Sequence, residues 1–281
     1  MVRALVFFGF SLTAWAQGAP SIQKNIPYRT GDDQTAYEEA RCKLDLTLPA
    51  AGTKPIATLV WFYGGGLKNG SKDLPSEYCG EIAESFASQG FAVVIPDYRL
   101  SPQATYPSYV DDAAAAFAWT VRHIGRFGGD PRKVFIGGHS AGGYLALLVG
   151  FDKSRLKPYG LGLKDVAGIA QISGQVFTHY TVREERGQGR YSVTSDEAAP
   201  AFFVQQTLPP VLTLYSDHDM TGRAEENQFL VAMLKGAGHM ETYSLKVLNT
   251  DHGSVGHNIR TPADPGHQAI VNFLTQQAAR R

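Results

Sequence analysis

One pentapeptide, Gly138-His139-Ser140-Ala141-Gly142, limits most strongly what this chain can fold into. It follows a short apolar run with strand composition, at 134–136, and precedes a helix-forming run at 141–151. A strand that reverses directly into a helix needs an unfavourable backbone conformation, and flanking glycines leave room for it and for close helix–strand packing. The context therefore predicts that Ser140 stands on a sharp turn above the end of a sheet. A serine that only caps the start of a glycine-rich helix is the alternative.

The rest of the chain alternates in the same way between strand-like and helix-like segments. Short β-rich apolar runs predict strands at 44–48, 57–62, 91–95, 134–136, 166–172, 211–215 and 242–248. Apolar residues three or four apart predict helices at 81–89, 109–123, 141–151, 223–235 and 266–277. This alternation is typical of a mostly parallel sheet. We therefore expect an α/β fold, with helices on both faces of the sheet.

Composition and length predict a single domain at 17–281. Of the 281 residues, 43% are hydrophobic and 19% charged, so the chain can bury a full core and is too apolar to be disordered. The polar segment 174–199 shows no sustained period, and we expect it to be a small insertion before the strand at 211–215. Since 26 basic side chains balance 26 acidic ones, no nucleic-acid partner is predicted, and a small neutral partner is expected.

Residues 1–16 have the pattern of a cleaved signal peptide. One cation precedes an apolar run at 4–10, and Ala14-Trp15-Ala16 has the small-x-small form of a cleavage site. This run is too short to span a bilayer, so we expect a secreted or periplasmic protein with no membrane span. In an oxidising compartment, Cys42 and Cys79 either form a disulfide or remain two buried thiols.

A serine nucleophile needs a histidine base and an acid that holds the base in the correct tautomer. In this topology the acid follows the next-to-last strand and the histidine follows the last one. Asp219 and His252 occupy these places, and Asp217 and His257 are their rivals. We favour Asp219 and His252, because a residue close to the end of a strand is best fixed in position.

The tetrahedral intermediate of acyl transfer also needs hydrogen-bond donors for its oxyanion. Tyr63-Gly64-Gly65-Gly66 follows the strand at 57–62, and its glycines allow backbone N–H groups to line a cavity. The backbone N–H of Ala141 would supply another donor. A flexible turn is the alternative interpretation of this loop. No HExxH or CxxC pattern selects a metal, and no phosphate-binding loop implies a cofactor, so neither is expected.

Taken together, these motifs resemble the α/β-hydrolase esterases of the hormone-sensitive-lipase and bacterial feruloyl/acetyl-esterase (BD-FAE-like) groups. Besides the serine motif, the resemblance rests on Tyr63-Gly64-Gly65-Gly66, Asp97-Tyr98-Arg99-Leu100-Ser101-Pro102, Tyr106-Pro107, Asp111-Asp112, Gly129-Asp130-Pro131, Asp219 and His252. It implies Ser140, Asp219 and His252 as catalytic residues and Gly65, Gly66 and Ala141 as oxyanion donors. It also implies the α/β-hydrolase fold, with a mostly parallel central sheet of about eight strands, and that 97–102 is structural. These families usually begin the glycine loop with histidine, where this chain has Tyr63.

The resemblance implies a serine carboxylesterase that acts on short-acyl esters through an acyl-enzyme. The substrate is expected to be a small neutral ester, with an acylated saccharide as one candidate. An amidase or peptidase that uses the same residues is one alternative, and a catalytically inactive binding protein with this fold is another. Four aromatic residues of the insertion are candidate pocket walls, with ordinary packing as the alternative: Phe177, His179, Tyr180 and Tyr191.

Overall fold

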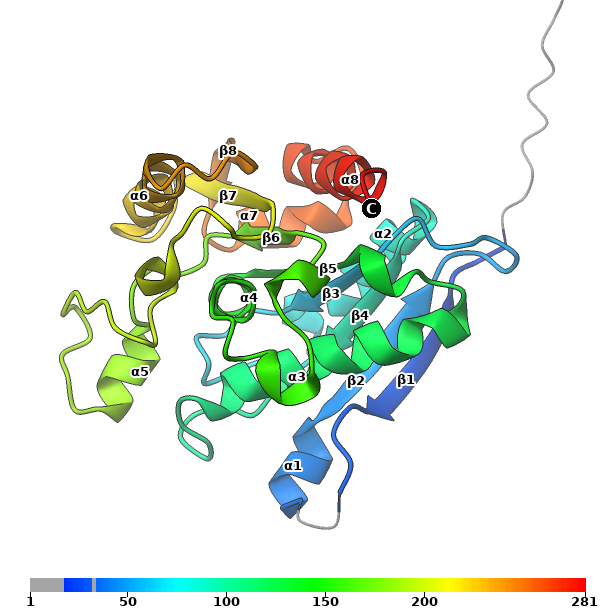
Figure 1. Ribbon diagram of the computed structural model, residues 1–281, viewed down its shortest axis with the longest axis horizontal. Coiled ribbons are helices and arrows are strands. Elements are labelled where there is room, and N and C mark those ends of the chain that lie inside the picture. The colour runs from blue at the N-terminus through cyan, green and yellow to red at the C-terminus, as the bar shows by residue number, and fades with distance from the viewer. Residues whose placement is uncertain (1–17, 32–33) are drawn as a thin grey trace, which may run out of the picture.

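The strand-forming runs pair into one eight-stranded sheet with the order β1-β2-β4-β3-β5-β6-β7-β8 (Figure 1). The computed structural model describes residues 18–31 and 34–281. The strands are β1 (Ser21–Pro27), β2 (Lys43–Leu48), β3 (Thr58–Phe62), β4 (Ala92–Pro96), β5 (Val134–His139), β6 (Ile169–Ile172), β7 (Val211–His218) and β8 (Thr242–Asp251). Strands β3 to β8 pair in parallel, and β2 pairs antiparallel with both β1 and β4. The predicted mostly parallel sheet of the α/β-hydrolase fold is confirmed.

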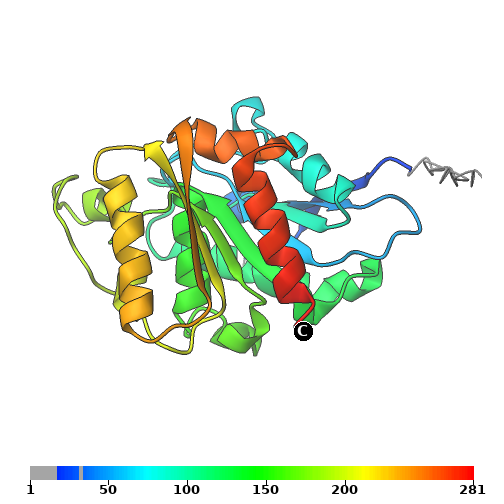
Figure 2. The ribbon, with the colours of Figure 1, turned by 90° about the horizontal axis from the view of Figure 1, so that it is seen from above.

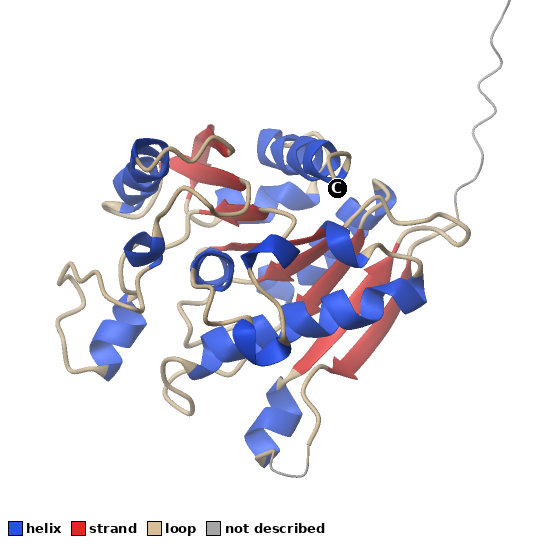
Figure 3. Ribbon diagram, viewed as in Figure 1, coloured by secondary structure: helices blue, strands red, loops and turns tan. Residues whose placement is uncertain are grey.

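Helices cover both faces of this sheet (Figures 1 and 3). They are α1 (Ala36–Arg41), α2 (Cys79–Ser88), α3 (Ser108–His123), α4 (Ala141–Phe151), α5 (Tyr180–Glu185), α6 (Arg223–Gly236), α7 (Ser254–His257) and α8 (Pro265–Ala278). Helices α3, α4 and α6 lie on one face, and α2 and α8 lie on the other. The view from above shows β7 and β8 edge-on between α6 and α8 (Figure 2).

The predicted elements differ from the observed ones mainly at the edges of the sheet and in short helices. Strand β1 is absent from the prediction because this edge strand is almost fully exposed and has no apolar pattern. Helices α1, α5 and α7 have six, six and four residues, which is too short for an amphipathic period to show. The segment 174–199, expected to be irregular, contains the short helix α5. As predicted, this segment lies before β7, and it follows β6.

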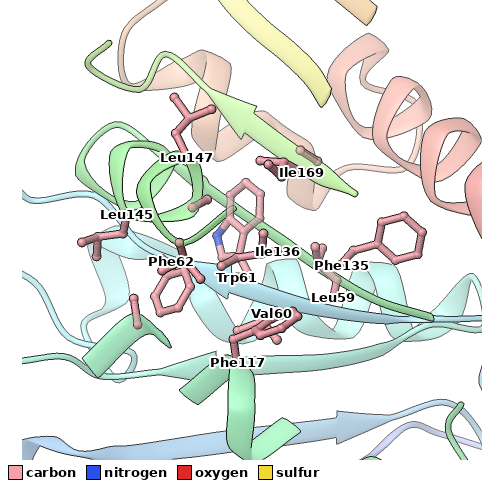
Figure 4. Close-up of a cluster of buried hydrophobic side chains, with 14 of the residues drawn as sticks. Leu59, Val60, Trp61, Phe62, Phe117, Phe135, Ile136, Leu145, Leu147 and Ile169 are labelled. Atoms are coloured by element: carbon pink, nitrogen blue, oxygen red, sulfur yellow. The ribbon is translucent and has the colours of Figure 1, made fainter. Parts of the chain in front are cut away.

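The core lies between the central strands and the helices that pack on them. All five residues of β3 are buried, and their side chains meet those of β5 and of helices α3 and α4 (Figure 4). Burying each large apolar side chain stabilises the fold by about 1.5–3 kcal/mol, so these strands form a rigid base. Because β3 is covered on both faces, Leu59 to Phe62 form a continuous apolar run and do not alternate with polar residues.

The parallel strands deliver polar residues to one edge of this rigid base. Parallel strands share the edge at which their carboxyl ends lie, and ligand sites of open α/β sheets lie there. Five strands end directly before a residue of the candidate site: β3 before Tyr63, β5 before Ser140, β6 before Ser173, β7 before Asp219 and β8 before His252. The fold thus brings together positions that are far apart in sequence.

Candidate active site

Ser140 stands on the sharp turn between β5 and α4, with φ 54° and ψ −116°. The flanking glycines are required by close approach to the neighbouring backbone. A Cβ atom on Gly142 would lie 2.0 Å from the carbonyl oxygen of Phe62, and one on Gly138 would lie 2.5 Å from the carbonyl carbon of Gly142. The backbone N–H of Ser140 donates to the carbonyl of Ile172 (2.8 Å) and fastens the turn to β6. The structure therefore has the turn that the motif predicts.

Three predicted side chains form one hydrogen-bonded chain at this turn. His252 Nε2 lies 2.8 Å from Ser140 Oγ, and His252 Nδ1 lies 2.5 Å from Asp219 Oδ1. In neutral His252 the Nδ1–H therefore donates to the carboxylate, and Nε2 can accept the serine proton. The arrangement is that of a nucleophile, its general base and the acid that orients the base.

The rival residues have other roles. Both carboxylate oxygens of Asp217 accept backbone N–H groups of β8, from Asn249 (3.0 Å) and Thr250 (3.1 Å), so Asp217 fixes the irregular end of the β7–β8 pair. His257 lies in α7 with its ring 4.9 Å from that of Tyr78. Neither of these rivals hydrogen-bonds to the described atoms of Ser140.

Asp219 is held by groups that favour its ionised form. Burial raises its pKa, but hydrogen bonds from His252 and Ser173 outweigh burial and leave the pKa below its ordinary value. Ser173 Oγ donates to Asp219 Oδ2 (2.5 Å), and the backbone N–H of Met220 donates to Oδ1 (2.8 Å). The sequence analysis missed Ser173, although it directly follows β6, the strand between those that carry Ser140 and Asp219.

The residue before the nucleophile is a second buried histidine. His139 is buried, and its Nε2 lies 2.6 Å from the backbone carbonyl of His252. Burial lowers the pKa of His139 to about 3, so the ring is neutral at physiological pH. Because a carbonyl can only accept, the proton of the neutral ring lies on Nε2. His139 thereby connects the serine turn to the backbone of the predicted base.

The glycine loop after β3 folds so that its backbone N–H groups are free. Gly65 and Gly66 have φ values of 92° and 64°, in the left-handed region that favours glycine. A Cβ atom on Gly65 would lie 2.1 Å from the carbonyl oxygen of Asn69. Within residues 18–31 and 34–281, no group accepts a hydrogen bond from the N–H of Gly65, Gly66 or Ala141. The N–H of Ala141 also opens helix α4, whose dipole favours negative charge there.

Contacts on the carbonyl side fix the direction of these N–H groups. The Tyr98 hydroxyl donates to the carbonyl of Gly64 (2.9 Å), and the backbone N–H of Asn69 donates to the carbonyl of Gly65 (3.0 Å). The N–H and C=O of a trans peptide point in opposite directions. These two hydrogen bonds therefore direct the N–H of Gly65 away from the Tyr98 hydroxyl and the N–H of Gly66 away from Asn69. Tyr98 belongs to the 97–102 segment that the resemblance implies is structural.

Tyr63, which stands where related loops usually have histidine, points into the protein. Its ring stacks on Tyr98 with centroids 4.7 Å apart. Its hydroxyl donates to Asp97 Oδ1 (2.8 Å) and accepts a hydrogen bond from Arg41 Nη2 (2.8 Å). The exchange of histidine for tyrosine therefore changes how the start of the loop is anchored, while the donors remain backbone groups.

The candidate pocket walls of the insertion have different environments. Tyr191 is 90% exposed, His179 is completely buried, and Phe177 stacks on an aromatic ring of α6. Tyr180 alone among the four lies against the glycine loop, because its hydroxyl occupies the space next to Gly66. For His179 and Phe177 the packing alternative therefore holds.

The two cysteines are free and separately buried, so the disulfide alternative is not realised. Burial raises the pKa of the Cys42 thiol to about 12, which keeps it neutral. In the part of the chain that the structure describes, no cluster of three or more His, Cys, Asp or Glu side chains could hold a metal ion. In that same part, no helix combines the length and apolar character needed to cross a membrane.

The geometry agrees with comparisons to known proteins. The profile of the BD-FAE family matches residues 44–176. A truncated carbohydrate esterase from gut microbiota has a TM-score of 0.75 at 18% identity, over 94% of this chain and 99% of that one. Residues 44–176, just under half of the chain, are thus similar to the BD-FAE family, and the chain has the α/β-hydrolase fold. The solved structure, at this level of identity, supports the fold alone.

Two curated relatives also match the chain. Versiconal hemiacetal acetate esterase of Dothistroma septosporum is 32% identical over 179 residues, which cover 63% of this chain and 50% of the relative. Esterase LipC of Mycobacterium tuberculosis is 25% identical over 244 residues, covering 80% of this chain and 59% of the relative. The chain thus spans between half and three-fifths of the length of these two relatives.

Proposed function

We propose that this protein is a serine carboxylesterase that hydrolyses short-acyl carboxylic esters through an acyl-enzyme. The observation that carries the proposal is the unbroken hydrogen-bonded chain from Ser140 through His252 to Asp219, beside three free backbone N–H groups. The esterase names of the two relatives support the same reaction class. Overall charge neutrality supports a small uncharged ester, and an acylated saccharide fits that description.

Each group has one role in the proposed reaction. His252 Nε2 takes the proton of Ser140 as Oγ attacks the ester carbonyl carbon, and Asp219 stabilises the resulting imidazolium. The N–H groups of Gly65, Gly66 and Ala141 stabilise the oxyanion. The imidazolium then protonates the departing alcohol. Water repeats the same sequence on the acyl-enzyme and releases the acid.

The test is the hydrolysis of short nitrophenyl esters by the wild type and by Ser140→Ala. We expect the variant to lose at least ~10³-fold in kcat with an unchanged melting temperature, because only one hydroxyl is removed. A fluorophosphonate probe should label the wild type and not the variant. Unchanged turnover by Ser140→Ala contradicts the proposal, and faster cleavage of a matched anilide than of the ester favours an amidase.

The proposal extends to the location of the protein. Residues 1–16, which have the signal-peptide pattern, lie outside the described residues, so export to the periplasm or the medium is proposed on the sequence pattern alone. N-terminal sequencing of the protein recovered from the medium or periplasm should begin close to Gln17. Recovery of the uncleaved chain from the cytosol alone would contradict it.

A further inference from the structure

The hydroxyl of Tyr180 lies directly beside the glycine loop. A Cβ atom built on Gly66 would be only 2.0 Å from Tyr180 Oη. A Cβ atom lies about 2.5 Å from the backbone nitrogen of its own residue, so Tyr180 Oη is within about 4.5 Å of Gly66 N. Two donors that each approach one oxygen to about 2.8 Å commonly stand about 4–5 Å apart. Tyr180 Oη is therefore close enough to Gly66 N for both groups to donate to one oxygen.

This hydroxyl is available for such a bond. Among residues 18–31 and 34–281, no group forms a hydrogen bond with Tyr180 Oη. The backbone N–H of Tyr180 donates to Gln175 Oε1 (3.1 Å), which leaves the side-chain hydroxyl as the uncommitted group. The side chain is half-buried, so its position is defined while part of it still faces solvent.

Neighbouring contacts hold Tyr180 in this position. The hydroxyl of Thr181 donates to the carbonyl of Gly66 (2.6 Å), and Lys68 Nζ pairs with Glu184 (2.5 Å), so α5 is fastened to the loop at two further points. The guanidinium of Arg190 lies 4.2 Å from the centroid of the Tyr180 ring. A donor fixed before the reaction needs little reorganisation when charge develops, which is the condition for strong transition-state stabilisation.

We propose that Tyr180 is a further catalytic residue whose O–H donates to the oxyanion, together with the N–H groups of the glycine loop. This inference rests on the serine-esterase function proposed above. As Ser140 Oγ forms a bond to the carbonyl carbon, the π pair moves onto the carbonyl oxygen and the serine proton passes to His252. Tyr180 keeps its proton and contributes a hydrogen bond only. When the intermediate collapses, the pair returns and the alcohol leaves with the proton from His252.

The test is Tyr180→Phe, which removes one oxygen atom that makes no hydrogen bond to the described protein. Loss of a single oxyanion donor typically lowers kcat by ~10²–10³-fold, and we expect a loss of about this size with KM nearly unchanged. A trifluoromethyl ketone inhibitor, whose hemiketal adduct with Ser140 resembles the tetrahedral intermediate, should bind more weakly by a similar factor. The control is Tyr191→Phe in the same insertion, where the ring is 90% exposed and both constants should stay at the wild-type values.

The rate is expressed per active site, titrated to its end point with a fluorophosphonate, so that partial misfolding of Tyr180→Phe does not imitate a catalytic loss. A kcat and inhibitor affinity like those of the wild type overturn the role of Tyr180. A rise in KM with unchanged kcat also overturns it, since the hydroxyl would then bind ground-state substrate. These results are distinct from failure of the proposed function, which would appear as turnover by Ser140→Ala.

Discussion

His139 makes the stability of this protein dependent on pH in a way that one substitution can isolate. Burial lowers its pKa from 6.5 to about 3, so below pH 6.5 the unfolded chain takes up a proton that the folded protein excludes. The free energy of unfolding therefore falls as the pH falls. Because proton binding is linked to unfolding, these two pKa values predict that the free energy of unfolding falls by about 2 kcal/mol between pH 7 and pH 5 from this ring alone.

The variant that removes this effect is His139→Gln, whose amide can still donate to the carbonyl of His252. Urea unfolding at pH 7 and pH 5 gives the stability loss of each protein, and we expect the loss to be about 2 kcal/mol smaller in the variant. Other buried histidines such as His267 titrate in both proteins and cancel in the comparison. His218→Gln is the control, because that side chain is 76% exposed. Equal losses in the wild type and His139→Gln would refute the reasoning.

Two further predictions concern the acid and the glycine loop. Asp219→Asn should lower kcat by roughly 10³–10⁴-fold, because His252 loses the partner that fixes its tautomer, whereas Asp217→Asn should lower the melting temperature and leave kcat within about twofold. Steady-state kinetics and thermal melts of both variants test this, and equal kcat values would contradict it. Gly65→Ala should cost at least ~10²-fold in kcat or prevent folding, since its Cβ would meet Asn69 at 2.1 Å with φ at 92°. Gly162→Ala, where a Cβ meets nothing within 4 Å, is the control, and a fully active Gly65→Ala would contradict the geometry.

The sequence predicted the central strands well because they are buried on both faces. Strand β3, for example, is apolar from Leu59 to Phe62; it starts one residue after the predicted strand, and both end at Phe62. Strand β1 gives no such signal: its residues face solvent, and pairing with β2 defines it. Tertiary pairing, not local sequence, thus determines this edge of the sheet.

The choice of acid shows where sequence reasoning depends on an exact boundary. The predicted strand ended at Tyr215, which put Asp217 closer to its end than Asp219. In the structure β7 continues to His218, so Asp217 lies within the strand and Asp219 is the first residue after it. The rule that a residue beside a strand end is best placed for chemistry therefore selects Asp219 once the strand is drawn at its observed length.

The contacts that the sequence could not reveal lie on the carbonyl side of the glycine loop. Tyr98 and Thr181 come from distant parts of the chain, and each donates to a loop carbonyl. The 97–102 motif marks Tyr98 as structural without showing which carbonyl it contacts, and no motif includes Thr181. The loop presents backbone N–H groups, so its own side chains are free to vary, as Tyr63 does. The direction of the Gly65 N–H is instead set by the Tyr98 hydroxyl, and that of the Gly66 N–H by the backbone N–H of Asn69. In this arrangement the geometry of an oxyanion site can change through a residue outside the glycine motif, even where the motif itself is intact.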